Sequence, residues 1–428
     1  MSLCSSRSNI GIFYLTLHMS SVPTRYVVAN RERSYRVGIS AGVSNGNVSE
    51  LIEAIGFRKA LLVTTPTVAR LYANEIAKRL LESGAYVSMV VVACSEQSKI
   101  LSEVEKLCRE CFRAGLDRRS VLIGCGGGVC TDLVTMAASL ARRGLNYIRI
   151  PTTLIGLIDA GIGIKGAVNL PGKKSALGCF HPPENVLLDP SFLRTLPKKL
   201  ISDGLAEAIK VAMVMDIGLF EFIERYRREF LEFPHTADIG KMTELVWCST
   251  VRLLEELERN LYEDKTYRRL LDFGHTFSPL IESESGFRIS HGMAVSIDIA
   301  VSTGIAFELG LVGAHDRDRI LTMLMNAGLP IYSPLLTTES GCRAMAEMEA
   351  HRGGHLNLVL PGGIGRSVFV NDKDHVQPQA LRRALDYLRR ESQRPVVTIP
   401  VGSSIEPATT ADTHMKLRQT MPLWAAET

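Results

Sequence analysis

The sequence lacks several features that would assign it to a special class of protein. Its nine cysteines are scattered without even spacing, which is unlike a disulfide framework. Several lie inside apolar runs (Cys94, Cys125 and Cys248), which fits reduced, buried thiols in a cytoplasmic enzyme. No apolar run reaches the roughly 18 residues that a membrane span needs, so no membrane partner is expected. Lysine and arginine form no long basic block and the formal net charge is only +4, so nucleic acid is not an expected partner either. A chain of 428 residues, 46% of them hydrophobic, is long enough for two or three domains with a large core.

Short β-branched runs alternate with amphipathic helical segments from Tyr35 to about Asp189. Such alternation is typical of a parallel, doubly wound sheet, in which ligands bind at the carboxyl ends of the strands. The pattern predicts a helix over 68–83 and strands over 60–64, 86–92, 120–124 and 147–150, the first three of them buried.

The β signal fades after about Pro190. We therefore expect a Rossmann-like α/β domain that binds NAD at 25–190, and a mainly α-helical, metal-binding domain at 191–391 that faces it across a cleft. Residues 1–24 and 392–428 are expected to be a flexible leader and a flexible tail. Helices are predicted over 198–228, 237–262, 275–285, 291–311 and 315–327, with a late strand or hairpin over 356–361.

The turn Gly126-Gly127-Gly128 stands where the predicted strand 120–124 passes into a helix. Glycines at such a turn let the backbone approach a ligand closely, and the free N–H groups at a helix start attract a pyrophosphate. A tight structural turn is the alternative. Glu96, after the second strand, could bind ribose hydroxyls in the same fold, or could be an ordinary charge at a helix start.

Glu207, His275 and His291 form a candidate metal site, because a carboxylate with two imidazoles suits Zn²⁺ with open positions for substrate oxygens. Both histidines adjoin glycine in apolar segments, where an imidazole without a partner would be costly. The alternative is that they are structural residues with hydrogen-bond partners.

A group of cations gathers in the same part of the sequence and would suit a phosphorylated substrate. Lys165 and Lys210 have apolar sequence neighbours, which predicts that both amines are buried, and Glu207 with Lys210 forms an i, i+3 pair on one helix face. A structural ion pair is the alternative for that couple. The cations are Arg143, Lys165, Lys173, Lys174, Lys210 and Arg268.

The order of motifs resembles the sugar phosphate cyclases, whose best-known member is dehydroquinate synthase. The resemblance extends from about residue 35 to about residue 390. It is carried by GGGVCTD, RRG before IPTT, DAGIGIK, GKKS, GLAEAIK, DFGHTFSP and HGMAV.

The resemblance implies roles for individual residues, a homodimer, and a metal that is Zn²⁺ or alternatively Co²⁺. Arg143 would reach the substrate phosphate across the subunit interface. The implied NAD contacts are Glu96, Lys99, Gly126, Gly127, Gly128, Asp132, Thr152, Thr153 and Lys174. The implied metal ligands are Glu207, His275 and His291; the catalytic candidates are Asp159, Lys165, Lys210, Arg268 and Asp272; and the phosphate contacts are Arg143, Lys165 and Ser175.

Departures from dehydroquinate synthase favour another branch of the family. That enzyme has Asn where this chain has Asp272, and a lysine for the substrate carboxylate where this chain has the acidic stretch Leu254 to Glu258. Acids in that place would repel a carboxylate, so the expected substrate lacks one. Together with the segments ELERNLYED (256–264) and RGGHLNLVLP (352–361), this pattern resembles the sedoheptulose 7-phosphate cyclases, especially the branch that forms 2-epi-5-epi-valiolone.

The resemblance implies a cycle without net redox change. NAD⁺ oxidises the C5 hydroxyl, phosphate leaves, NADH returns the hydride, and ring opening with an aldol closure gives the cyclitol. Lys165 and Lys210 would position oxygens and relay protons, with amine pKa values lowered by burial and neighbouring charge. The rival functions are 2-epi-valiolone synthase, desmethyl-4-deoxygadusol synthase, 3-dehydroquinate synthase and a metal-dependent NAD polyol dehydrogenase.

Overall fold

The computed structural model describes residues 33–394, so the predicted leader at 1–24 and nearly all of the predicted tail at 392–428 lie outside the described residues. Backbone contacts divide the chain into Met1–Ser34 and Tyr35–Thr428. All that follows concerns the described part of the second unit. The domain boundary near residue 190 stays a prediction.

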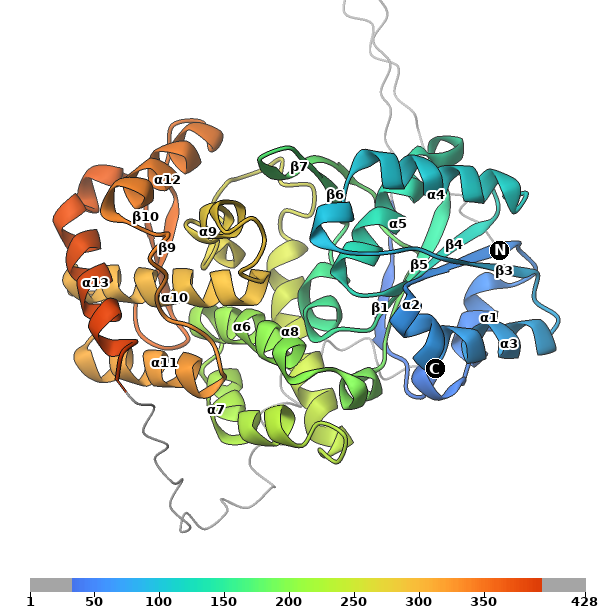
Figure 1. The fold of residues 1–428 in the computed structure, drawn as a ribbon, viewed down its shortest axis with the longest axis horizontal. Coiled ribbons are helices and arrows are strands. Elements are labelled where there is room, and N and C mark those ends of the chain that lie inside the picture. The colour runs from blue at the N-terminus through green and yellow to red at the C-terminus, as the bar shows by residue number, and fades with distance from the viewer. Residues whose placement is uncertain (1–32, 395–428) are drawn as a thin grey trace, which may run out of the picture. The chain divides into compact units, whose positions relative to one another are not determined.

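A six-stranded sheet, in which every neighbouring pair is parallel, forms the first half of this unit (Figure 1). The strand order β1-β8-β5-β4-β2-β3 confirms the expected doubly wound α/β fold. The sequence patterns did not predict β1 and β8, the first and last strands of this sheet in chain order. The strands are β1 (Arg36–Ile39), β2 (Ala60–Thr64), β3 (Val87–Val91), β4 (Val121–Gly126), β5 (Asn146–Pro151) and β8 (Asn185–Leu188).

Helices cover both faces of the sheet because successive side chains of a buried strand point to opposite faces. In β4, Ile123 packs with Leu51 and Leu80 of the helices on one face, whereas Leu122 packs with Val104 and Val134 of the helices on the other. The first pair of helices is α1 (Ser49–Ile55) and α3 (Asn74–Glu82); the second is α4 (Leu101–Arg113) and α5 (Gly128–Leu140).

Two expectations about burial are wrong. Strand β3 pairs only with β2 within the described part of the chain, so it is an edge strand whose Met89 and Val91 side chains are exposed rather than buried. Cys94 and Cys248 lie in apolar runs but are only partly buried, whereas Cys125 on central β4 is fully buried.

An antiparallel hairpin, β6 (Lys165–Leu170) with β7 (Lys173–Phe180), lies on α5 and was not predicted. Gly166 makes this packing close, since a Cβ there would stand 2.6 Å from Thr135 Cγ2. The hairpin carries the GKKS segment toward the helical half, where β7 contacts α9 (Figure 1).

Helices dominate the second half, as predicted. Helices α6 and α10 are buried along most of their length and pack against each other at its centre (Figure 1). The predicted helix 198–228 is two helices, because Asp216 leaves the helical conformation and its side chain accepts a hydrogen bond from Leu219 N (3.0 Å), which caps the second. The elements are α6 (Lys198–Met215), α7 (Ile217–Glu232), α8 (Ile239–Leu257), α9 (Ser278–Glu284), α10 (His291–Glu308), α11 (Ala314–Asn326), α12 (Thr338–His351), α13 (Pro378–Glu391), β9 (Leu358–Pro361) and β10 (Ser367–Val370).

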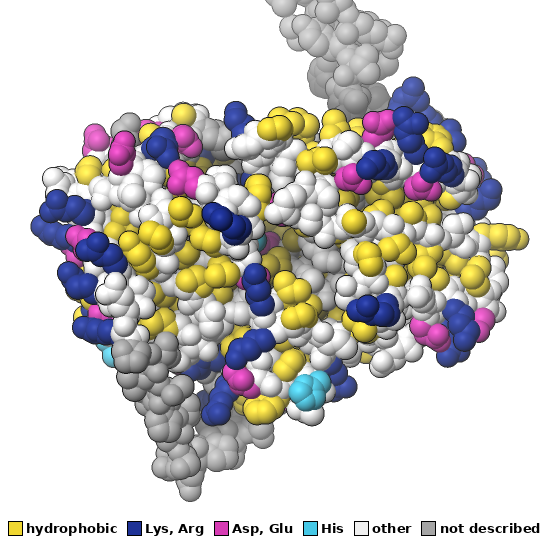
Figure 2. All heavy atoms as spheres, in the orientation of Figure 1, with side chains coloured by type: hydrophobic (Ala, Val, Ile, Leu, Met, Phe, Trp, Pro, Cys, Tyr) yellow, Lys and Arg dark blue, Asp and Glu magenta, His cyan; other side chains and the backbone are white. Residues whose placement is uncertain are grey.

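The surface of the described unit mixes side chains of different kinds. On the face in Figure 2, basic and acidic side chains are interspersed with apolar ones, and the face is hollowed near its centre. Among residues 33–394, no helix is both long and apolar enough to span a bilayer.

Candidate functional site

Glu207, His275 and His291 meet at one point, although they come from three separate segments of the second half. One ligand atom from each lies within 4.8 Å of the others. Glu207 Oε1 is 3.1 Å from His291 Nε2 and 3.9 Å from His275 Nε2. Both carboxylate oxygens are buried; Oε2 faces the ammonium of Lys210 (2.6 Å), whereas Oε1 faces the two imidazoles. An anionic oxygen beside two imidazole nitrogens suits a metal cation.

The far nitrogens of both imidazoles are held by other groups. His275 Nδ1 is 3.1 Å from the Phe273 carbonyl oxygen, and His291 Nδ1 is 3.0 Å from Glu282 Oε1. An Nδ1–H that donates to such a partner leaves Nε2 free to bind a metal, which is the usual arrangement around metal-binding histidines. Glu282 was not predicted from the sequence, because its role depends on a contact between α9 and α10.

The pKa values of the two histidines are consistent with a site in which a metal ion displaces a proton. Burial lowers the pKa of His275 to about 3, so its imidazole is neutral. Burial also opposes charge on His291, but the carboxylates of Glu282 and Glu207 outweigh it and raise the pKa of His291 to about 9. Metal binding would therefore release a proton from His291.

Lys210 is fully buried beside this cluster. Its Nζ lies 2.6 Å from Glu207 Oε2 and 3.6 Å from Asp159 Oδ2. The predicted i, i+3 pair on α6 is confirmed, but the expected lowered pKa is wrong. Burial opposes the charge on Lys210, yet Glu207 and Asp159 outweigh burial and raise its pKa above the ordinary value. The same contact holds the pKa of Glu207 well below its ordinary value despite burial.

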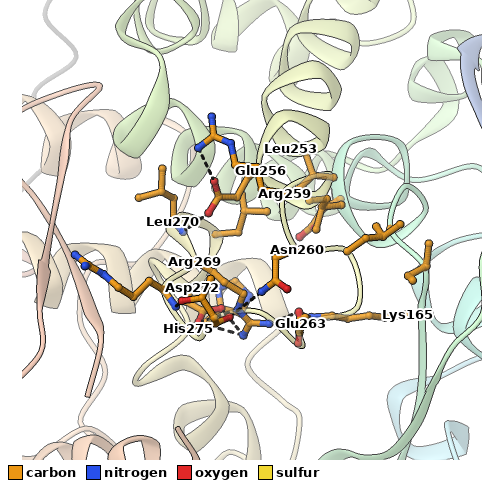
Figure 3. A pocket seen from close by; sticks show the side chains of 18 of the residues that line it. Lys165, Leu253, Glu256, Arg259, Asn260, Glu263, Arg269, Leu270, Asp272 and His275 are labelled. Atoms are coloured by element: carbon orange, nitrogen blue, oxygen red, sulfur yellow. Dashed lines mark hydrogen bonds and ion pairs between the residues drawn. The ribbon is translucent and has the colours of Figure 1, made fainter. Parts of the chain in front are cut away.

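A cavity of about 420 Å³ opens beside the cluster, between the first and second halves of the unit (Figure 3). Six of the candidate catalytic and metal-binding residues stand in its wall: Asp159, Lys165, Lys210, Arg268, Asp272 and His275. The guanidinium of Arg268 lies 4.7 Å from the centre of the Phe369 ring.

Alternating charges cross the wall of this cavity (Figure 3). Lys165 pairs with Glu263, which also pairs with Arg269; Arg269 Nη2 is 2.8 Å from Asp272 Oδ1, and Arg352 Nη2 is 2.6 Å from Asp272 Oδ2. The expectation that Lys165 is buried is wrong. Its side chain is 56% exposed. Lys165 stands at the start of β6 and extends toward Glu263, which lies in the loop after α8. Neither Glu263 nor Arg352 was singled out as a site residue.

The glycine turn stands at the carboxyl end of β4 and the start of α5, as predicted. Gly127 is the N-cap of α5, and no side chain caps the helix there. A Cβ at Gly127 would lie 2.9 Å from Thr153 Cγ2, whereas one at Gly128 would lie 3.5 Å from its nearest neighbour, Ala160 Cβ. Gly127 is therefore needed for packing, and Gly128 leaves room above the open helix start.

The other predicted cofactor residues contact one another around this turn. Thr152 N donates to Gly126 O (3.0 Å). Lys99 Nζ lies 2.5 Å from Asp132 Oδ2, and Glu96 Oε1 accepts a hydrogen bond from Asn169 Nδ2 of β6 (2.9 Å). Lys99 thereby joins the loop after β3 to α5, and Glu96 joins the same loop to the hairpin.

The remaining candidates lie in different places: one is beside the candidate metal ligands and three are exposed on the surface. Lys174 lies on β7 with Nζ 2.5 Å from Glu282 Oε2 and 3.2 Å from His291 Nδ1, which places it beside the candidate metal ligands. Ser175 is exposed, and its N–H donates to Asn169 Oδ1 (2.7 Å). Arg143 is exposed after α5 and does not line the cavity, and Lys173 is exposed at the start of β7.

Arg149 is a further residue that the sequence reasoning missed. It is fully buried in β5 and donates to the carbonyl oxygens of Gly161, Gly163 and Lys165, and to Thr135 Oγ1 (2.7 Å). It thereby fixes the loop between Asp159 and Lys165 to the sheet. A charged residue inside the apolar run YIRIP was the signal available in the sequence.

Comparison with known proteins identifies the family. Residues 89–203 match the model for the 3-dehydroquinate synthase N-terminal region, and residues 204–349 match the model for its C-terminal region. A 2-epi-5-epi-valiolone synthase from Streptomyces glaucescens is 39% identical over 363 residues, which cover 84% of this chain and 92% of the relative. The chain belongs to the sugar phosphate cyclase family.

Other members of the family bear on the site. The solved structure of 2-epi-5-epi-valiolone synthase from Streptomyces hygroscopicus subsp. jinggangensis 5008, with NAD⁺ and Zn²⁺ bound, is 36% identical, has a TM-score of 0.80, and is matched over 86% of this chain and 99% of its own. A 3-dehydroquinate synthase from Vibrio atlanticus is 33% identical over 85% of this chain and 99% of the relative. Members with different activities are therefore similar along most of the chain.

Proposed function

We propose that this protein is a sedoheptulose 7-phosphate cyclase that forms 2-epi-5-epi-valiolone and inorganic phosphate, with NAD and Zn²⁺, or alternatively Co²⁺, as cofactors. Relatives that are themselves 2-epi-5-epi-valiolone synthases support this reaction, and the binding residues fit both cofactors. Glu207, His275 and His291 would hold the metal, and the uncapped start of α5 would receive the pyrophosphate.

The charge of the cavity wall is the observation that carries the choice of substrate. Of the cations in that wall, only Arg268 has no carboxylate partner among the described residues. Glu256, in the stretch where dehydroquinate synthase has a lysine for the substrate carboxylate, accepts a hydrogen bond from Leu270 N (2.8 Å) and faces the cavity. Four carboxylates, those of Asp159, Glu256, Glu263 and Asp272, stand in this wall. These carboxylates can accept hydrogen bonds from sugar hydroxyls, and because the other cations in the wall are paired, Arg268 is left for a single anionic group.

The chain's own side chains would bind and orient the sugar. When bound, NAD supplies a reversible hydride acceptor, and the metal supplies a positive charge next to the substrate oxygens. Lys210 is a charged donor held in place by two carboxylates, so it can hold a substrate oxygen and pass a proton to or from Asp159. Arg268 is available to the phosphate, and the exposed amine of Lys165 would reach it by exchanging its ion pair with Glu263 for the phosphate.

Phosphate release tests the substrate. We expect the protein to release phosphate from sedoheptulose 7-phosphate and not, at comparable efficiency, from the carboxylate-bearing seven-carbon substrate of dehydroquinate synthase. Equal turnover of both would assign the chain to dehydroquinate synthase. NADH that accumulates during turnover would indicate a polyol dehydrogenase instead. NMR of the product distinguishes 2-epi-5-epi-valiolone from 2-epi-valiolone and desmethyl-4-deoxygadusol.

We also propose a cytoplasmic homodimer in which Arg143 of one subunit completes the phosphate site of the other. Every cysteine described is a free thiol, which supports a reducing compartment. Arg143 is exposed, and no carboxylate among the described residues pairs with it, so it is available to an anion. Mixing Arg143→Ala subunits with Lys210→Ala subunits should restore activity, because one of the two sites in a heterodimer would be intact. No recovery despite demonstrated subunit exchange would refute the intersubunit role.

A further inference from the structure

Three segments far apart in the sequence supply one ionic network at the cavity. The segment 256–264 contributes Glu263, the segment that begins at Asp272 contributes that carboxylate, and the segment 352–361 contributes Arg352. All three belong to the pattern that resembles the sedoheptulose 7-phosphate cyclases in the sequence, but only Asp272 and Glu263 stand in the cavity wall. Arg352 therefore belongs to the ionic network through Asp272 but does not line the cavity.

Arg352 is buried, with 3% of its side chain exposed, behind Asp272. Its Nη2 donates to Asp272 Oδ2 (2.6 Å), and its Nη1 donates to the carbonyl oxygens of Leu356 (2.7 Å) and Asn357 (3.0 Å). Asp272 is the only carboxylate that pairs with Arg352 among the described residues. The guanidinium thus joins the turn before β9 to one oxygen of Asp272.

This geometry constrains which way Asp272 can turn. A carboxylate held by one rigid, bidentate guanidinium alone can still tilt, but a second donor on Oδ2 fixes the plane of the group. Arg269 contacts both oxygens: its Nη2 is 2.8 Å from Oδ1, and its Nε (3.3 Å) and Nη2 (3.1 Å) donate to Oδ2. Fixing the plane holds the carboxylate in one orientation at the cavity wall, where a substrate hydroxyl can donate to it.

We propose that Arg352 is a positioning residue for substrate: it fixes the Asp272 carboxylate so that this group can accept a hydrogen bond from a hydroxyl of the sugar phosphate. This inference rests on the proposed function, since it assumes a polyhydroxylated sugar phosphate in the cavity. Arg352 does not touch the substrate and acts only through Asp272.

A double-mutant cycle tests whether Arg352 acts through Asp272. Arg352→Met, Asp272→Asn and the double variant are compared with wild type by kcat and KM for sedoheptulose 7-phosphate. We expect Arg352→Met to lower kcat/KM about ten- to hundred-fold, as outer-sphere partners of functional groups do. In the Asp272→Asn background the same change should have an effect of less than about two-fold, because the group that Arg352 positions is already altered.

Two further variants separate positioning from folding. Arg343→Met removes an exposed arginine that pairs with Glu284 and should leave kcat/KM unchanged. Arg352→Lys keeps the charge but not the three donor contacts, so it should recover activity only in part; it replaces Arg352→Met in the cycle if the latter does not fold. Zinc content and melting temperature show whether each variant is intact.

Independent effects of Arg352 and Asp272 on kcat/KM would overturn the inference, and so would an intact Arg352→Met with wild-type kinetics. Failure of the proposed function looks different. In that case wild-type protein does not release phosphate from sedoheptulose 7-phosphate, and the cycle is measured with the substrate that wild type does convert.

Discussion

Replacing Glu282 by Gln should weaken metal binding without removing a metal ligand. Glu282 Oε1 is 3.0 Å from His291 Nδ1, and Oε2 is 2.5 Å from Lys174 Nζ. The amide keeps the shape of the side chain but not its charge, so the ammonium of Lys174, 3.2 Å from His291 Nδ1, would lose its carboxylate partner beside the ligand. Losing such a partner of a metal-binding histidine typically costs 10- to 100-fold in affinity, which is about 1.4–2.7 kcal/mol.

The assay is a competition for Zn²⁺ between the metal-free protein and a chromophoric chelator. Glu284→Gln is the matched control, because Glu284 lies on the same helix, α9, but pairs with Arg343 at the surface. A surface ion pair of this kind contributes roughly 0–1 kcal/mol, and Zn²⁺ affinity should stay within about two-fold of wild type. A folded Glu282→Gln protein with wild-type Zn²⁺ affinity would refute the reasoning.

Two other predictions concern the cofactor turn and the thiols. Gly128→Ala should lower NAD affinity at least about ten-fold by calorimetry while the melting temperature changes little, because a methyl group there meets only Ala160 Cβ at 3.5 Å; unchanged NAD affinity would remove Gly128 from the cofactor site. Burial raises the pKa of the Cys125 thiol to about 12, whereas a hydrogen bond with Cys130 lowers that of Cys94. Peptide mapping after brief alkylation of the folded protein at neutral pH should find Cys94 modified well before Cys125, and equal rates would contradict this order.

Local spacing predicted the features that depend on neighbours in sequence. The strand before Gly126 and the helix after it follow from apolar periodicity, and the pairing of Glu207 with Lys210 follows from their i, i+3 positions on α6. Apolar neighbours likewise predicted the burial of Lys210 correctly.

Ion-pair partners that come from distant segments of the chain could not be predicted from local spacing. Lys165 has apolar neighbours too, but it stands at the start of β6 and pairs with Glu263, almost a hundred residues later. Only the fold brings that carboxylate to the amine. The expected lowered pKa of Lys210 was wrong because burial was weighed above its carboxylate partners: Glu207, on the same helix, and Asp159, which no helical spacing relates to α6, together outweigh burial.

The buried guanidinium of Arg149 has a consequence for motion at the site. It hydrogen-bonds the carbonyl oxygens of Gly161, Gly163 and Lys165, so the loop beside Asp159 cannot open without stranding a buried charge in the sheet. Amide hydrogens of this loop should therefore exchange with solvent at the slow rate of the central strands rather than at the rate of a surface loop. The segment between the glycine turn and the cavity would then unfold with the sheet as one cooperative unit.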